Sequence, residues 1–196
     1  MMYYFLMPKY KRRYGMLPYD VNDYTTEICD KCGSILVKYS NTISFIIKGE
    51  LCDYYMFDNL IFVSSRFLEV LNKYNIRNYS FKDANVYNNK ELERLSSDDK
   101  KNYYELQVVG RCGFLQNLNN KILPVCSACG ERIHNTGIIT NGLSISNDYY
   151  DDSDLFAFSN LKTMPIVTER LKNILVNNHL TNIAFSPINN YIIDDR

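Results

Sequence analysis

Two stretches of the chain carry apolar residues at helical spacing, each directly after a residue with a side-chain hydroxyl. The apolar positions are Phe67, Leu68 and Leu71 in the first stretch and Leu171, Ile174 and Leu175 in the second. Residues three and four positions apart share one face of an α-helix. Ser64 and Thr168 stand where an N-cap oxygen is needed. The pattern therefore predicts helices over Ser64–Tyr74 and Thr168–Asn177.

Both predicted helices are followed by asparagines and then by a short alternating segment. Asn75, and Asn177 or Asn178 in the second stretch, can take the left-handed conformation that ends a helix. The next residues alternate apolar and polar side chains, as strands with one buried face do. We expect these two strands to end near Phe81 and Phe185.

Further strands are expected at "MMYYFLMP", at the start of the sequence, and at "YYELQVVG", residues 103–110. Between the two helical regions lies "NNKELERLSSDDKKN", which is polar and charged. Such a composition is typical of a connector or a loop. We therefore interpret residues 88–102 as a polar connector.

The helical stretches belong to a longer internal repeat. Val63–Phe81 aligns without gaps on Val167–Phe185, with identical residues at several positions. Ahead of each lies a second matching block, "DYYMFDNL" at Asp53–Leu60 and "DLFAFSNL" at Asp154–Leu161. The alternative is a chance match between two amphipathic helices, but the blocks recur in the same order. The sequence thus predicts two similar halves, approximately 27–87 and 103–190.

Charge and composition narrow the possible functions. Lys plus Arg and Asp plus Glu both number 22, so the formal net charge is zero, whereas nucleic-acid binders usually carry a basic excess. No stretch approaches the roughly 18 apolar residues of a membrane span. In "MMYYFLMPKYKRR" the charges follow the apolar run, whereas in a secretory signal they precede it. We therefore expect a cytoplasmic protein without membrane association.

Four of the six cysteines form two Cys-x-x-Cys-Gly motifs, at Cys29 and Cys32 and at Cys126 and Cys129. A disulfide framework needs an oxidising compartment, and a thioredoxin-like motif is normally a single copy. Two glycine-terminated turns can instead direct four thiolates onto one tetrahedral zinc ion. Reduced cysteines without metal are the remaining alternative. We predict one structural Zn²⁺ per chain, held by all four.

The other two cysteines, Cys52 and Cys112, have no partner at this spacing, and we expect them to be small buried apolar residues. Together these observations predict an α+β fold. Two pseudo-repeated strand-helix-strand halves are joined through a shared pair of zinc knuckles with four cysteines, and a single zinc-stabilised domain spans residues 1–196. In each half we expect the order knuckle, loop, strand, helix, strand.

The chain resembles the double-CxxCG immunity proteins of bacterial toxin–immunity systems. The resemblance is carried by both Cys-x-x-Cys-Gly motifs, by "YYELQVVGRCG" before the second motif and by "DLFAFSNLKTMPIVTERLKNILVNNHLTNIAFSPI" near the end. The order and spacing of these segments cover nearly all of the chain. The sequence departs from the family pattern in a shorter middle region and in having no tryptophan. The resemblance implies that the partner is a cognate protein toxin, which the chain neutralises by stoichiometric occlusion.

Enzyme activity is not expected. The two histidines, His134 and His179, are isolated, and no Gly-rich phosphate loop, nucleophile elbow or open metal triad is present. His134 follows the second cysteine motif and is either an alternative ligand or a surface residue. The competing function is a zinc-ribbon adaptor that binds nucleic acid or another protein. Its candidate contact is "PKYKRRYG", residues 8–15, which could grip phosphates and stack bases. The alternative is a solvated turn.

A candidate toxin contact lies in "NDYYDDSD", residues 147–154. Tyr149 and Tyr150 would supply contact area, and Asp151 and Asp152 would speed the encounter with a basic toxin face. An ordinary solvated loop is the alternative interpretation of this segment.

Overall fold

The computed structural model of the chain describes residues 2–9, 14–18, 24–39, 43–49, 51–57, 60–88 and 103–195. Two sequence predictions fall partly outside the described residues. Residues 10–13 of the basic segment lie outside them, and so do residues 89–102 of the polar connector.

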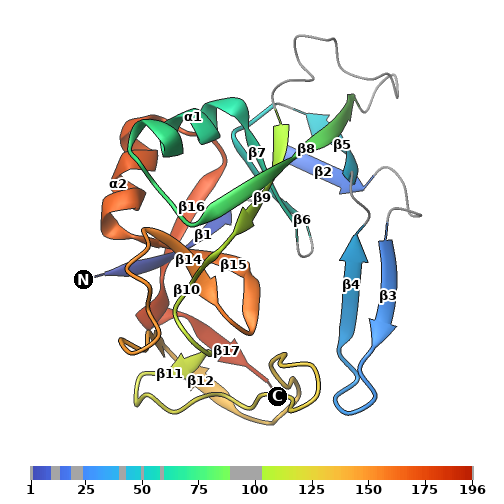
Figure 1. Cartoon of the computed structure of the whole chain (residues 1–196), viewed down its shortest axis with the longest axis vertical. Helices are drawn as coiled ribbons and strands as arrows, with labels where there is room; N and C mark the ends of the chain where they lie inside the picture. The colour runs from blue at the N-terminus through green and yellow to red at the C-terminus, as the bar shows by residue number, and fades with distance from the viewer. Residues whose placement is uncertain are drawn as a thin grey trace.

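Two larger sheets and two helices form the body of the described chain (Figure 1). The first sheet has the order β10 (Gly110–Arg111), β14 (Leu155–Phe158), β15 (Leu161–Thr168), β1 (Tyr3–Pro8) and β16 (Ile183–Pro187). The second has the order β2 (Tyr14–Pro18), β5 (Ile43–Gly49), β8 (Tyr79–Asn88), β9 (Tyr103–Val108), β7 (Leu60–Ser64) and β6 (Tyr54–Phe57). The helices are α1 (Ser65–Lys73) and α2 (Glu169–Asn177). The fold is therefore mixed, with sheet predominating.

Three smaller sheets have two strands each. They pair β3 (Tyr24–Ile28) with β4 (Ile35–Tyr39), β11 (Gln116–Asn117) with β13 (Leu143–Ser144), and β12 (Ile139–Asn141) with β17 (Ile192–Asp194). A 3-10 turn, η2 (Ile188–Asn190), precedes β17. In the part of the chain that is described, neither helix is long or apolar enough to cross a lipid bilayer.

The helix predictions are confirmed, including their N-caps. The Ser64 hydroxyl accepts a hydrogen bond from the Phe67 N–H, and the Thr168 hydroxyl accepts one from the Leu171 N–H, both at 3.2 Å. Each hydroxyl satisfies one of the donors that the first helical turn leaves unpaired. The strands predicted at the start of the chain and at residues 103–110 are also present, as β1 and β9.

The C-terminal end of the second helix differs from the prediction. Asn75 has the expected left-handed φ of 54°, but in the second helix His179 takes this conformation, with φ 53°, and Asn178 does not. In both helices the residue after the left-handed one is buried, and its N–H bonds back five residues: Ile76 to Leu71, and Leu180 to Leu175. In this Schellman arrangement the left-handed residue directly precedes the buried apolar residue. After α2 the residue before Leu180 is a histidine, His179.

The predicted order of elements within each half was incomplete. A loop and one strand were expected ahead of each helix, but a two-stranded hairpin precedes both, β6–β7 before α1 and β14–β15 before α2. All four residues of β14 are buried, and so are all five of β7. Strands covered on both faces lose the alternation by which a strand is recognised.

Four strands of one sheet are paired in the same order as four of the other: β14-β15-β1-β16 and β6-β7-β9-β8. The registers also correspond. Val167 faces Tyr4 and Phe185 faces Leu6 in the first sheet, and Val63 faces Tyr104 and Phe81 faces Leu106 in the second. The residues of β1 and β9 begin "YYFL" and "YYEL". The matching strand order thus extends to β1, which lies before the predicted limit of residue 27.

The two helices lie next to each other over one apolar cluster (Figure 1). Its fully buried members include Val63 and Leu71 from the first half of the sequence, and Val167, Leu171 and Leu175 from the second. The cluster is continuous across both halves, so the two sheets share a core.

Asp53 links the first hairpin to both helices. Its carboxylate accepts hydrogen bonds from the Ser64 hydroxyl at 2.7 Å and from the Thr181 N–H and hydroxyl at 2.7 and 2.8 Å. Arg66 donates to the same carboxylate at 3.3 Å and, through its other terminal nitrogen, to the Asn178 carbonyl at 2.6 Å. Arg66 therefore bridges the start of α1 and the end of α2.

Asp154 makes the corresponding links from the second hairpin. It accepts from the Thr168 hydroxyl and from Arg170. Arg170 also donates to the Tyr74 carbonyl at the end of α1, at 3.1 Å. Each helix thus supplies an arginine to the C-terminal end of the other.

Candidate metal centre

The first cysteine motif forms the turn of the β3–β4 hairpin. Gly33 has φ 71°, and its N–H donates to the Cys29 carbonyl at 2.8 Å. The Cys29 N–H in turn donates to the Ser34 carbonyl at 2.9 Å. A Cβ added at Gly33 would meet no atom within 4 Å, so the glycine is needed for its backbone conformation and not for space. The turn brings Cys29 and Cys32 to one side of the hairpin tip.

The second motif repeats this geometry at a different place in the fold. Gly130 has φ 77°, and its N–H donates to the Cys126 carbonyl at 2.9 Å. The Cys126 N–H donates to the Glu131 carbonyl, also at 2.9 Å. A bridge between Val125 and Arg132 closes the turn. Both motifs therefore build the same knuckle, as the shared sequence pattern predicts.

The two knuckles meet sulfur to sulfur. Cys29 lies 3.8 Å from Cys126, and Cys32 lies 3.6 Å from Cys129, although each pair is 97 positions apart in the sequence. All four sulfur atoms lie within 4.8 Å of one another, and all four cysteines are free. A tetrahedron with metal–sulfur bonds of about 2.3 Å has edges of about 3.8 Å. The four cysteines can therefore hold one metal ion in tetrahedral coordination.

Hydrogen bonds at the knuckles favour ionised sulfur at two of the four positions. The hydroxyl and backbone of Ser34 lower the pKa of Cys32 to about 6. Backbone amides of Cys129 and Ala128 lower the pKa of Cys126. At Cys129 the backbone hydrogen bond at Glu131 acts in the same direction, but burial and the neighbouring sulfurs outweigh it and raise the pKa to about 12. A metal that binds all four thiolates must therefore displace protons, and its affinity should fall at low pH.

Arg132 attaches the second knuckle to the C-terminal end of the chain. One of its terminal nitrogens donates to both carboxylate oxygens of Asp195, at 2.7 and 2.6 Å, and both side chains are largely buried. The other terminal nitrogen lies 2.9 Å from His134 Nδ1. His134 is exposed and does not belong to the sulfur cluster, so its place is that of a surface residue bonded to Arg132.

Cys52 and Cys112 lie away from the cluster and are buried, as predicted. Burial raises the pKa of both thiols, and that of Cys112 reaches about 12. These two side chains therefore remain neutral at physiological pH and act as small apolar residues.

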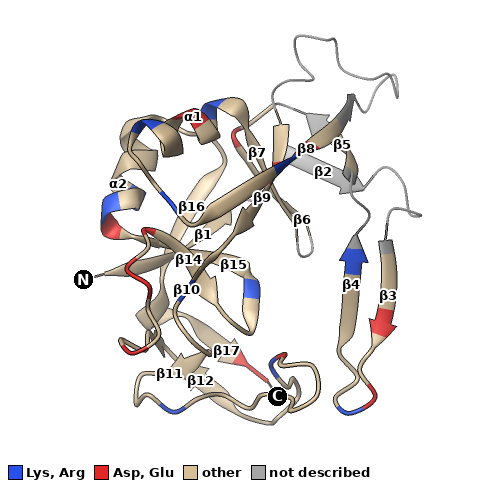
Figure 2. Cartoon of the chain, in the orientation of Figure 1, with Lys and Arg blue, Asp and Glu red and all other residues tan. Residues whose placement is uncertain are grey.

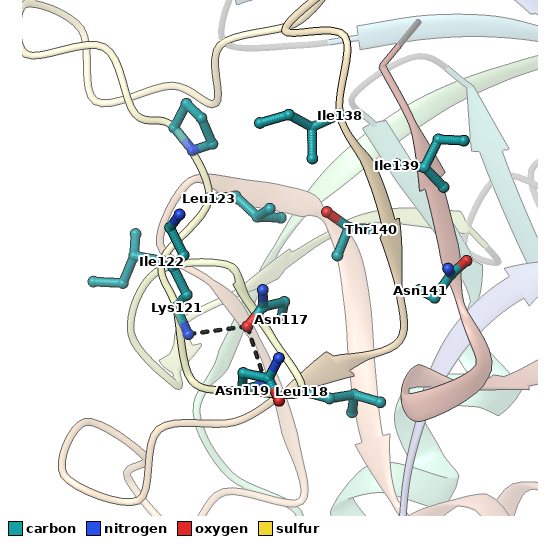
Figure 3. A pocket seen from close by; sticks show the side chains of 11 residues that line it. Asn117, Leu118, Asn119, Lys121, Ile122, Leu123, Ile138, Ile139, Thr140 and Asn141 are labelled. Atoms are coloured by element: carbon teal, nitrogen blue, oxygen red, sulfur yellow. Dashed lines mark hydrogen bonds between the residues drawn. The ribbon is translucent and has the colours of Figure 1, made fainter.

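A shallow hollow of about 330 Å³ adjoins the second knuckle (Figure 3). Asn117 shapes its rim, since its side-chain oxygen accepts backbone N–H bonds from Asn119 and Lys121, each at 3.0 Å. Ile122 and Ile138 line the hollow and are about half exposed. The hollow thus combines exposed isoleucines with polar side chains such as Lys121 and Asn141.

Two of the four predicted toxin contacts hold their own loop together. The Tyr150 ring packs against Phe156 with the centroids 4.8 Å apart, and its hydroxyl donates to the Ser153 carbonyl at 2.7 Å. The Asp151 carboxylate accepts from the backbone N–H groups of Arg111 and Ser153, at 3.0 and 3.1 Å. Both residues therefore have a structural role, which the sequence did not indicate.

The other two predicted contacts face outward. Tyr149 is 70% exposed, and Asp152 is also exposed. Beside the loop lies a groove of about 580 Å³, whose lining includes Asp152, Asp154, Glu169 and Arg170. Figure 2 marks Asp and Glu residues in red along this loop and at the start of α2. The segment combines an exposed aromatic ring with an acidic groove.

Comparison with known proteins adds no further evidence. No protein-family model matches the sequence, and no curated protein is significantly similar to it. A functional proposal must therefore be supported by the cysteine cluster, by the surface of the described residues and by the motif resemblance.

Proposed function

We propose that the protein is a zinc-containing immunity protein that binds a cognate antibacterial toxin and neutralises it by stoichiometric occlusion. The observation that carries this proposal is the pair of Cys-x-x-Cys-Gly knuckles, which have the same backbone hydrogen bonds and direct four sulfurs to one point. These motifs are the first element of the resemblance to double-CxxCG immunity proteins. The second element, the segment from Asp154 to Ile188, forms the hairpin, helix and strand around α2.

The metal in this proposal is Zn²⁺, and its role is structural. Four thiolates fill the tetrahedral positions that zinc prefers, so no position remains open for water or substrate. The ion would connect residues that are 97 positions apart in the sequence. Metal analysis of protein purified without chelator should find close to one zinc per chain, and two ions or none would contradict the shared site.

We further propose that the two halves derive from one repeated unit. The matching strand order, the corresponding registers and the exchanged arginines support this interpretation. The unit would begin at β1, ahead of the predicted boundary at residue 27, and at β9, which starts at the predicted boundary of residue 103. A superposition of the two units by a rotation of about half a turn is the expected relation.

The proposed toxin contact is the exposed part of the acidic loop together with its groove. Asp53 receives two hydrogen bonds from Thr181, which seal it from solvent. Among the described residues, the Asp154 carboxylate accepts side-chain hydrogen bonds from Thr168 and Arg170 alone, and it lines the groove. A carboxylate can accept about four hydrogen bonds, so Asp154 has capacity left for donors from a partner. A basic toxin surface would supply such donors.

Growth rescue tests the proposal directly. Co-expression with the cognate toxin in a sensitive cell should restore growth, and the purified proteins should form a one-to-one complex. Asp152→Lys combined with Tyr149→Ala should slow association, mostly at low salt. Glu69→Lys is the matched control, because it makes the same charge change at an exposed position on α1.

Asp151 is not a suitable test position, because its carboxylate holds the loop. Full rescue by the Asp152 and Tyr149 variant would rule out this surface but leave the immunity function standing. Tight, salt-sensitive binding to DNA or RNA with no toxin binding would overturn the immunity function and favour the adaptor.

A further inference from the structure

The β3–β4 hairpin stands apart from the two sheets (Figure 1). From Thr25 to Lys38, none of its residues is fully buried or belongs to an apolar cluster of the described chain. Ile28 and Ile35 face each other across the two strands and are 68% and 62% exposed. The hairpin therefore gains little of its stability from apolar burial against the body.

The hydrogen bonds and sulfur contacts that join residues 25–38 of the hairpin to the rest of the described chain are at its tip. They are the two sulfur pairs, at 3.8 and 3.6 Å, and a contact of 3.4 Å from Lys31 Nζ to the Ser127 hydroxyl. Every one of them reaches the second knuckle.

Without a metal, these contacts cannot hold the hairpin in place. A hydrogen bond between two thiols is weak, two neighbouring thiolates repel each other, and a long exposed Lys–Ser hydrogen bond contributes little. An isolated two-stranded hairpin is itself only marginally stable in water. The position of the hairpin therefore depends on an ion that binds both pairs of sulfurs.

The second knuckle, in contrast, is attached to the body by protein contacts. Arg132 is paired with Asp195, and the Gly137 N–H donates to the Asp195 carbonyl at 2.8 Å. The Ile133 N–H donates to the Pro124 carbonyl at 2.9 Å. These bonds do not involve any cysteine sulfur, so they should survive loss of the metal.

We propose that the metal acts as a clasp: when it is bound, it fixes the β3–β4 hairpin to the second knuckle, and its removal releases the hairpin while both sheets and both helices stay folded. This inference rests on the proposed zinc site but not on the proposed toxin partner. Metal supply would then determine whether the hairpin and its exposed isoleucine pair occupy a fixed place.

Hydrogen exchange followed by mass spectrometry on the full chain tests the clasp. With zinc bound, backbone amides of residues 24–39 should be protected. A chelator should accelerate their exchange by at least about tenfold, as expected for a locally opening segment. Peptides covering α1 and α2 should change by less than about twofold. Re-addition of zinc should restore protection.

Variants separate the clasp from other effects. Cys32→Ser should accelerate exchange in the hairpin as the chelator does. Ser127→Ala, which removes only the lysine contact, should leave exchange unchanged. Absence of zinc from the native protein would overturn both the site and the clasp. Zinc bound with hairpin exchange unaltered by the chelator would overturn the clasp alone, and so would simultaneous loss of protection in both helices.

Discussion

Removal of the Asp53 carboxylate should destabilise the fold far more than removal of its counterpart, Asp154. Asp53→Ala leaves the Ser64 hydroxyl and both donors of Thr181 without their acceptor. The Asp53 side chain is only 9% exposed, so water cannot easily replace it. In Asp154→Ala the lost partners are Thr168 and an arginine that is 55% exposed.

The expected magnitudes follow from these contacts. Three buried hydrogen bonds to a charged group contribute about 1.5 kcal/mol each at the lower end of the usual range. The exposed Arg66 adds less than about 1 kcal/mol. Asp53→Ala should therefore cost about 5 kcal/mol, and Asp154→Ala about 2 kcal/mol. For a chain of this size the corresponding decreases in Tm are about 15 °C and about 6 °C.

Thermal and urea denaturation, followed by far-UV circular dichroism, would measure both variants under identical metal-loaded conditions. Equal losses for the two variants, or a larger loss for Asp154→Ala, would refute the reasoning. Either result would mean that the Thr181 contacts do not distinguish the two carboxylates.

Three further predictions concern the core, the buried thiol and the helix end. Leu171→Ala should cost about 2–5 kcal/mol in urea unfolding, because the side chain is fully buried, whereas Val176→Ala on the exposed side of α2 should cost less than about 0.5 kcal/mol. Burial raises the pKa of the Cys112 thiol from its ordinary value of 9.0 to about 12 in the folded protein. The unfolded state therefore loses this proton at lower pH than the folded state, and the free energy of unfolding should fall as the pH rises between those two values. Urea unfolding across that range should show a smaller decrease for Cys112→Ala. His179→Gly should stabilise the protein by up to about 1 kcal/mol, because its φ of 53° is unfavourable for side chains with a Cβ, and no gain in Tm would contradict this.

The helices and the knuckles could be predicted from the sequence because they depend on interactions between residues only a few positions apart. An N-cap hydroxyl such as Ser64 acts on an amide three residues away, and a Cys-x-x-Cys-Gly turn closes on itself. The joining of the two knuckles followed from a chemical requirement, since a tetrahedral thiolate site needs four sulfurs and each motif has two.

Features decided by distant contacts could not be predicted in this way. Tyr150 and Asp151 look like free surface residues in the sequence, but contacts with residues far along the chain, such as Phe156 and the Arg111 amide, give them structural roles. One strand of each hairpin was missed, because β7 and β14 are buried along their whole length and lack the alternation of a half-exposed strand. His179 was missed because burial of Leu180, and not residue preference, decides which residue after α2 takes the left-handed conformation.

An arginine near the start of each helix donates a hydrogen bond to a carbonyl at the end of the other helix. This reciprocal pair has the form of an isologous contact, which two identical subunits make across a twofold axis. A shorter chain with one such unit would have two of the four thiolates and one of the two arginines, and pairing with a second copy would complete both sets. Under the proposed repeat, fusion of two such copies into one polypeptide would remove the need for identical surfaces. The Asp53 side can then remain sealed by Thr181 and preserve the fold, while the Asp154 side is free to diverge with whatever it binds.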